Sequence, residues 1–328
     1  MSVQPAIVPP PEPHRPRLSL VAPRVHTLVT LGDSTAAGLG DPMPGGGWRG
    51  FPVLLAEALG ARLVNPAVTG ARVADVRRDQ LPVALAAEPD VAVVFVGMND
   101  TLRSDFDPAR MRADLAATVG ALRSAGAHVV LMRYHDHTRV FPLPAPLRRA
   151  LWRRVVALNA AVDAVVDGAV DGAADGVVAA GGGIGVLDLD ALPGGYEPAA
   201  WAIDRLHPSE LGHRILAAGL ATLVADAGFA VPGPVSLRCG GGREVTVLHR
   251  AAWLVFKGVP WLVRRGRDLG PVIVQGLAGE LRAAWRGRRL VRRPGAPAPE
   301  PRARWAWRSR AAPRSATAGP GCRWDRSR

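Results

Sequence analysis

The stretch HTLVTLGDST, residues 26–35, places a short apolar run directly before a polar turn. His26 to Leu31 is short enough for a fully buried strand, and Gly32 marks its end. Four later runs have the same character, being rich in Val, Leu or Ile: Ala61 to Asn65, Val91 to Val96, His128 to Arg133 and Ile184 to Leu187. We therefore predict five buried strands.

Longer segments with helical spacing lie between and after these runs. They are Trp48 to Leu59, Arg72 to Ala87, Pro108 to Ala125, Leu147 to Val166 and Ser209 to Ala227. Strands that alternate with helices are typical of a parallel sheet whose crossover helices cover both faces. The sequence thus predicts an α/β fold, a three-layer α/β/α sandwich with a mostly parallel five-stranded sheet.

Composition divides the chain of 328 residues into four parts. Residues 1–24 form a Pro-rich leader without the apolar stretch of a signal peptide, so we expect a flexible leader and a cytoplasmic protein. The α/β domain is predicted to span residues 25–232. A basic, Trp-containing amphipathic helical extension is expected at 233–293, and a disordered Arg/Pro/Ala-rich tail at 294–328.

Positive charge is concentrated in the C-terminal third of the chain. Residues 231–328 hold 21 Lys and Arg against 5 Asp and Glu, whereas residues 1–230 hold 20 against 23. We therefore expect any attraction to anionic lipid or nucleic acid to lie in the extension. The two cysteines, Cys239 and Cys322, indicate neither a disulfide framework nor a Cys-based metal site.

The extension permits two interpretations. Ala251 to Val263 is too short to cross a bilayer, which needs about 20 residues. Its tryptophans, with the arginines that follow, suit a helix on an anionic membrane surface, a peripheral contact that would involve residues 247–290. The alternative is a helix that packs on the domain or on a second subunit. Nucleic acid is not favoured as a partner, because no recognition motif accompanies the Arg-rich end. The oligomeric state is left open.

Residues with catalytic chemistry follow the predicted strands. Ser34 comes after the first strand, Gly70 after the second, Asn99 after the third, and Asp204 with His207 after the fifth. The carboxyl ends of parallel strands share one edge of a sheet, so we expect these residues to gather there. A serine hydroxyl becomes a nucleophile when an imidazole removes its proton and a carboxylate orients that imidazole, and the sequence supplies both.

Four blocks of sequence hold these residues: Gly32-Asp33-Ser34, the glycine of Asn65-Pro66-Ala67-Val68-Thr69-Gly70, Gly97-x-Asn99-Asp100 and Asp204-x-x-His207-Pro208. In them the chain resembles the SGNH hydrolases, also called GDSL-type esterases and lipases, over roughly residues 26–227. The resemblance implies a flavodoxin-like fold, Ser34 as nucleophile, His207 as general base and then acid, and Asp204 as its orienting carboxylate. It also implies an oxyanion hole made by the backbone amides of Ser34 and Gly70 and the side-chain amide of Asn99.

Each motif also has a purely structural interpretation. A Gly-Asp-Ser tripeptide is often only a turn, and an Asp three residues before a His can be an ordinary cap. The ordered occurrence of all four blocks favours the hydrolase. Asp33 and Asp100 are interpreted as structural, with loop hydrogen bonds beside the site. The nucleophile elbow of α/β-hydrolases is rejected, because its serine follows several strands.

Four residues near the predicted loops are candidates for the substrate pocket: Thr35, Met98, His135 and Trp201. The segment His135-Asp136-His137 could imitate a set of metal ligands, but no further spaced ligands appear nearby. We therefore expect neither a metal nor a cofactor.

The favoured hypothesis is a serine esterase that hydrolyses carboxylic esters with short- or medium-chain acyl groups through an acyl-Ser34 intermediate. Its substrate would be a small-molecule or lipid ester. One alternative is a catalytically idle scaffold whose basic tail binds membrane or nucleic acid. Another is an acyltransferase or a carbohydrate deacetylase of the same fold.

Overall fold

The computed structural model describes residues 22–43, 45–140, 143, 145–171 and 182–240, together with five positions between 274 and 285. The tail 294–328 and almost all of the predicted leader and helical extension lie outside the described residues, as does most of the proposed membrane-contact segment 247–290. Within the described part of the chain, no helix is both long and apolar enough to span a bilayer.

The five predicted strands form one sheet in which every neighbouring pair is parallel, in the order β2-β1-β3-β4-β5. The strands are β1 Thr27–Gly32, β2 Arg62–Val64, β3 Val91–Phe95, β4 His128–Arg133 and β5 Ile184–Asp188. Every residue of β1 and β3 is buried, as expected for strands covered on both faces. The predicted fold class is confirmed.

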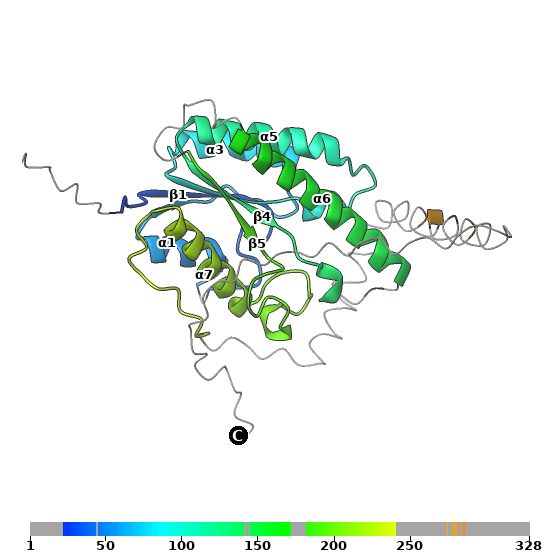
Figure 1. Ribbon diagram of the computed structural model, residues 1–328. Coiled ribbons are helices and arrows are strands. Elements are labelled where there is room, and N and C mark those ends of the chain that lie inside the picture. The colour runs from blue at the N-terminus through cyan, green and yellow to red at the C-terminus, as the bar shows by residue number, and fades with distance from the viewer. Residues whose placement is uncertain are drawn as a thin grey trace, which may run out of the picture.

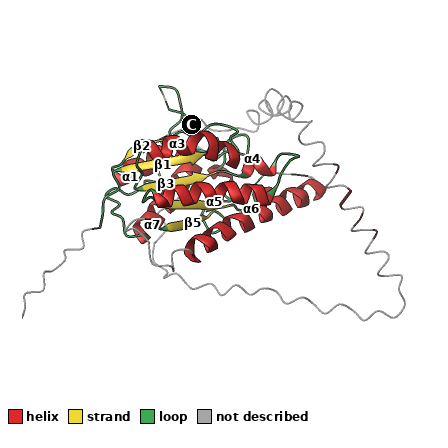
Figure 2. Cartoon of the chain, turned by 90° about the horizontal axis from the view of Figure 1, so that it is seen from above, coloured by secondary structure: helices red, strands yellow, loops and turns green. Residues whose placement is uncertain are grey.

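Helices cover both faces of the sheet and complete the three layers (Figure 1). On one face lie α1 Gly50–Leu59 and α7 Glu210–Asp226, and on the other lie α3 Leu81–Ala86, α5 Pro108–Ser124 and α6 Ala145–Asp171. Figure 2 shows α5 and α6 side by side above the strands. The short elements are α2 Val73–Asp75, η1 Val76–Gln80, α4 Met98–Thr101, η2 His137–Arg139 and η3 Pro198–Ala200.

One predicted helix, Arg72 to Ala87, is divided into α2, η1 and α3. The middle piece is a π-helical turn in which the Leu81 N–H donates to the carbonyl of Val76. The side chain of Gln80 in this turn is buried, and it accepts from the backbone N–H of Gly32 at 2.8 Å and donates to the Gly32 carbonyl at 2.9 Å. This pair of bonds holds the last residue of β1, directly before the Asp33-Ser34 turn.

The polypeptide after Ser34 is joined to α7 by buried polar contacts. His213 in α7 is fully buried; its Nδ1 accepts from the backbone N–H of Phe51 at 3.1 Å, and its Nε2 donates to the carbonyl of Leu39 at 2.9 Å. Gly40 lies against the carbonyl of Pro208, and a Cβ at this position would be 1.9 Å from that oxygen. The segment that follows Ser34 therefore packs directly on the loop that precedes α7.

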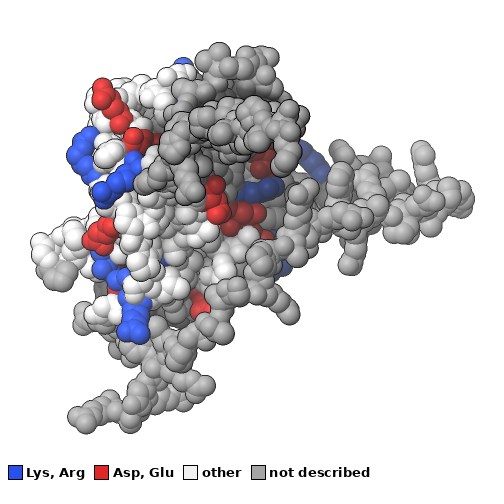
Figure 3. Space-filling view, turned by 60° about the vertical axis from the view of Figure 1, so that its left-hand side comes forward, with Lys and Arg blue, Asp and Glu red and all other residues white. Residues whose placement is uncertain are grey.

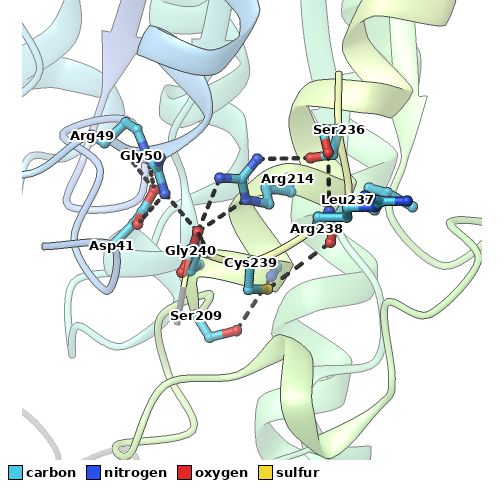
Figure 4. A network of polar contacts seen from close by, with 12 residues as sticks. Asp41, Arg49, Gly50, Ser209, Arg214, Ser236, Leu237, Arg238, Cys239 and Gly240 are labelled. Atoms are coloured by element: carbon cyan, nitrogen blue, oxygen red, sulfur yellow. Dashed lines mark hydrogen bonds and ion pairs between the residues drawn. The ribbon is translucent and has the colours of Figure 1, made fainter. Parts of the chain in front are cut away.

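A charged network extends this connection, as Figure 4 shows. Glu210, at the start of α7, accepts from Arg49 at 2.8 Å, from Arg214 at 3.0 and 3.1 Å, and from the backbone N–H of Gly240 at 2.8 Å. Arg49 also forms an ion pair with the buried carboxylate of Asp41 at 2.9 Å. Since bidentate arginine contacts fix geometry as well as charge, the network sets the position of the loop 41–49 relative to α7.

The described surface carries charges of both signs without a dominant one. Figure 3 shows acidic and basic side chains interspersed over the described part of one face. This distribution agrees with the nearly balanced charge of residues 1–230.

We predict that His213→Gln makes stability less dependent on pH. Burial lowers the pKa of His213 from 6.5 to about 4, so the unfolded chain binds a proton in this interval that the native state does not. Above pH 6.5 His213 is neutral in both the native and the unfolded state, so it does not lower the free energy of unfolding. As the pH falls from 6.5 towards 4, protonation of His213 in the unfolded chain lowers the free energy of unfolding by at most roughly 3 kcal/mol. Urea denaturation at a series of pH values should show a shallower decline for the variant. Parallel curves for the two proteins would contradict this origin of acid sensitivity.

Candidate active site

The residues with catalytic chemistry stand at the carboxyl edge of the sheet. Ser34 follows β1, Gly70 follows β2, Asn99 lies in α4 after β3, and the loop between β5 and α7 carries Asp204 and His207. The sheet order places β1 between β2 and β3, so three of these loops are neighbours. The topology therefore explains why segments far apart in sequence meet at one place.

A continuous line of hydrogen bonds joins Ser34, His207 and Asp204. Nε2 of His207 lies 2.8 Å from Oγ of Ser34, and Nδ1 lies 2.6 Å from Oδ2 of Asp204. A carboxylate only accepts hydrogen bonds, so we assign the ring proton to Nδ1, which leaves Nε2 to accept from the serine hydroxyl. This is the tautomer that a general base needs.

The turn Asp204-Arg205-Leu206-His207 holds its own carboxylate in place. Oδ1 of Asp204 accepts from the backbone N–H groups of Leu206 at 2.9 Å and His207 at 3.0 Å. Arg205 has φ of 57°, a left-handed conformation that costs energy for a residue with a side chain. Although burial opposes the ionised form, the bonds from His207 and from the turn keep the pKa of Asp204 below its usual value. The carboxylate is thus charged and oriented towards the imidazole.

The loop that carries Gly70 is fastened to the Ser34 segment by Asn65. The Asn65 side chain donates to the carbonyl of Ala36 at 2.9 Å and accepts from the backbone N–H of Ala67 at 3.1 Å. Gly70 has φ of +85°, and no described atom lies within 4 Å of the place where its Cβ would be. The backbone at Gly70 is therefore open to an incoming group, as a glycine allows.

The side chain of Asn99 faces the neighbours of Ser34 and Gly70. Its Nδ2 lies 3.3 Å from Oδ2 of Asp33 and 3.2 Å from the carbonyl oxygen of Ala71. None of the described residues accepts a hydrogen bond from the backbone N–H of Ser34 or of Gly70. Three donors expected for an oxyanion hole thus lie on loops that contact one another.

Two buried carboxyl groups lie beside these donors. Burial raises the pKa of Asp33 to about 7, although the Thr35 backbone N–H and the nearby His207 favour its charged form. Burial also raises the pKa of Asp100, which accepts from the Val73 N–H at 3.2 Å and from Arg72 at 3.3 Å. Asp100 therefore joins α4 to the loop after Gly70.

A cavity of about 70 Å³ lies next to the Ser34-His207 pair. All four pocket candidates, Thr35, Met98, His135 and Trp201, line it, and the other lining residues are mostly apolar. Its walls include both neighbours of Ser34 and both neighbours of His207, namely Asp33, Thr35, Leu206 and Pro208. The cavity therefore lies close to the hydrogen-bonded line, although neither Ser34 nor His207 is itself part of its wall.

The histidines of the cavity are buried and neutral. Nδ1 of His137 and Nε2 of His135 are 3.2 Å apart, and burial lowers the pKa of His135 to about 4 and that of His137 to about 3. Within the described residues, no group of three or more His, Cys, Asp or Glu side chains is arranged to hold a metal ion. These two imidazoles act as walls of the cavity.

Sequence reasoning missed several residues that position the site. Gln80 and Asn65 act through hydrogen bonds to backbone groups distant in sequence, and Tyr134, the residue that follows β4, lines the cavity. An Asn that precedes a Pro is a signal for a turn, so Asn65 had a recognisable local pattern. Gln80 and Tyr134 had none.

Comparison with known proteins places the chain in a family. The profile of the GDSL-like Lipase/Acylhydrolase family matches residues 30–215, more than half of the chain. No curated protein matches it. Solved structures that it resembles include TesA, with 22% identity, a TM-score of 0.46 and coverage of 62% of this chain and 99% of that chain.

Two further similar structures are those of esterases. The psychrotrophic esterase EstA from Pseudoalteromonas sp. is 18% identical with a TM-score of 0.45. The match covers 61% of this chain and 97% of the EstA chain. The acetylxylan esterase Axe2 from Geobacillus stearothermophilus is 22% identical with a TM-score of 0.45. The match covers 64% of this chain and 97% of the Axe2 chain. The family match is the finding that assigns the chain: it belongs to the GDSL-like lipase/acylhydrolase family and is a hydrolase of carboxylic esters.

Proposed function

We propose that the protein is a serine esterase that works through an acyl-Ser34 intermediate. The observation that carries the proposal is the unbroken hydrogen-bonded line from Oγ of Ser34 through the His207 ring to the Asp204 carboxylate. Such a line activates a hydroxyl that is otherwise a weak nucleophile. A catalytically idle scaffold gives no reason for a strained turn that aims a charged carboxylate at the imidazole.

In the first half of the reaction, Oγ of Ser34 attacks the ester carbonyl carbon while Nε2 of His207 takes the hydroxyl proton. Asp204, 2.6 Å from Nδ1, stabilises the imidazolium that forms. His207 then gives the proton to the leaving alkoxide, and the alcohol departs. In the second half, His207 removes a proton from water and the hydroxide attacks the acyl carbon. The bond from that carbon to Oγ of Ser34 then breaks, Oγ takes the proton back from His207, and the carboxylic acid departs.

The carbonyl oxygen of the substrate becomes negatively charged at each attack. The backbone N–H groups of Ser34 and Gly70 and the side-chain amide of Asn99 supply fixed donors for that charge. A missing donor of this kind typically costs about 3 kcal/mol of transition-state stabilisation. The donors belong to three loops held together by hydrogen bonds, so binding of the oxyanion requires only that Asn99 exchange its bond with Ala71.

The cavity beside Ser34 supports a short acyl group. Its volume of about 70 Å³ is roughly half that of a 150 Å³ cavity that accommodates benzene. Its mostly apolar lining suits a few methylene or methyl groups and includes no Lys or Arg to hold a free acid. An acetyl group on a larger alcohol, such as an acetylated sugar, also fits this size, so acetyl esters belong in any substrate panel.

The first test is ester hydrolysis by the wild type and by Ser34→Ala. We expect the wild type to hydrolyse p-nitrophenyl acetate and butyrate, and the variant to lose at least about a thousandfold in kcat, because no other group forms the acyl intermediate. Ser124→Ala, which alters an exposed serine at the end of α5, is the matched control and should keep full activity. If the wild type and Ser34→Ala are equally active, or equally inert across the panel, the proposed function is wrong.

The acyl-length proposal predicts a shift in preference for Trp201→Ala. The Trp201 ring lies 5.2 Å from the ring of His135 and 5.1 Å from that of His137, so its removal lengthens the cavity. The ratio of kcat/KM for an octanoate ester to that for an acetate ester should rise about tenfold or more. Trp152→Ala, at an exposed tryptophan of α6, should leave the ratio unchanged. An unchanged ratio in a folded Trp201→Ala protein would place the acyl group elsewhere.

A further inference from the structure

The amide group of Asn99 has both of its hydrogens engaged. Nδ2 carries two N–H bonds, and the structure provides one acceptor for each: Oδ2 of Asp33 at 3.3 Å and the carbonyl oxygen of Ala71 at 3.2 Å. If Asn99 is to bind the oxyanion, one of these two bonds has to be exchanged. The orientation of the amide therefore depends on which acceptor keeps its hydrogen.

Asp33 is the better fixed of the two acceptors. Its side chain is 3% exposed, and its Oδ1 accepts from the backbone N–H of Thr35 at 3.0 Å. Its own backbone N–H donates to the carbonyl of Phe95 at 3.2 Å, which ties the residue to the end of β3. Asp33 directly follows β1, so its hydrogen bond with Asn99 joins the end of β1 to the loop that carries Asn99, directly beside Ser34.

The charges around Asp33 come from several elements. His207, from the loop before α7, favours the ionised carboxylate, whereas Asp100, from α4, opposes it. Asp100 is itself paired with Arg72, and the buried Tyr134 at the end of β4 lines the same cavity as Asp33. The protonation of Asp33 therefore depends on charges from the loop before α7 and from α4.

Burial raises the pKa of Asp33 to about 7, so its carboxylate prevails above that pH, and a hydrogen bond to an ionised carboxylate is stronger than one to a neutral carbonyl. When the oxyanion forms, we expect the bond to Ala71 to break and the bond to Asp33 to persist. The N–H of Asn99 that no longer bonds Ala71 then donates to the oxyanion, while the bond to Asp33 fixes the plane of the Asn99 amide.

We infer that Asp33 is a positioning residue, which holds one amide hydrogen of Asn99 so that the other is presented to the oxyanion. The inference rests on the proposed esterase function of the site. Asp33 does not touch the substrate; its effect passes through Asn99. Asp33 has no part in the chemistry of Ser34, His207 and Asp204, and the inference gives its buried carboxyl group a role.

A double-mutant cycle tests the inference with four proteins: wild type, Asp33→Asn, Asn99→Ala and the double variant. An asparagine at position 33 that keeps the bond from Thr35 turns its own NH₂ group towards Asn99, so it can no longer accept. We expect Asp33→Asn to lower kcat by about tenfold to a hundredfold with KM changed by less than about threefold. In the Asn99→Ala background the same change should lower kcat by less than about threefold, because the residue through which Asp33 acts is gone.

The control cycle uses Asp100→Asn, which removes the other buried carboxylate, whose hydrogen bonds are with Arg72 and Val73. It should change kcat by the same factor with and without Asn99. The inference is overturned if Asp33→Asn lowers kcat equally in both backgrounds, or if Asp100→Asn shows the same coupling to Asn99. Asp33→Ser, whose hydroxyl is too short to reach Asn99, replaces Asp33→Asn in the cycle if that protein does not fold.

A second readout does not need turnover. The side-chain amide signals of Asn99 in a ¹⁵N–¹H NMR spectrum report its bond to Asp33 in the free protein. They should move in Asp33→Asn and stay in place in Asp100→Asn. An inactive wild type with this shift would overturn the proposed function alone, whereas an active wild type without the shift would overturn the role of Asp33 alone.

Discussion

The structure depends on one imidazole, that of His207, which bonds Ser34 at one nitrogen and Asp204 at the other. Ser34 and His207 are 173 positions apart in the chain, so only the fold brings them within 2.8 Å. The parallel sheet accomplishes this because β1 and β5 both end at the same edge, and α7 returns the chain to the neighbourhood of the first loop. Small displacements matter here, since proton transfer requires hydrogen-bond distance.

Contacts away from the reacting atoms keep that distance. Gln80 fastens the last residue of β1, and His213 attaches the segment after Ser34 to α7. The Glu210 network attaches the loop 41–49 to α7 (Figure 4). Asn65 draws in the loop with Gly70. These contacts join side chains to backbone groups or to opposite charges, and the bonds of Gln80 and His213 are buried, where they are hard to replace with water. Much of the polar interior therefore serves to hold the loops of the site in register.

The strands and the edge at which the site forms could be predicted from the sequence because both follow from local patterns. Short runs of Val, Leu and Ile indicate buried strands, and alternation with helices puts Ser34, Asn99 and His207 at one edge. The π-helical turn at Val76–Gln80 could not be predicted, since helical spacing alone does not reveal that Gln80 will pair with a backbone 48 positions away. The cavity is similar: Trp201 and His135 were expected near it, but its volume depends on how the segments that follow β1, β3, β4 and β5 pack with α7. The long-range contacts are the part that local sequence patterns do not predict.

The central claim is that Ser34 is the nucleophile that His207 activates. The most direct measurement is mass spectrometry of the intact chain and of its peptides after reaction with a p-nitrophenyl alkylphosphonate, which leaves a phosphonyl group on an activated serine. The account predicts a single adduct on Ser34, formed at least about a hundredfold more slowly in His207→Ala. An adduct on a different serine, or labelling of Ser34 at the same rate without His207, would contradict it.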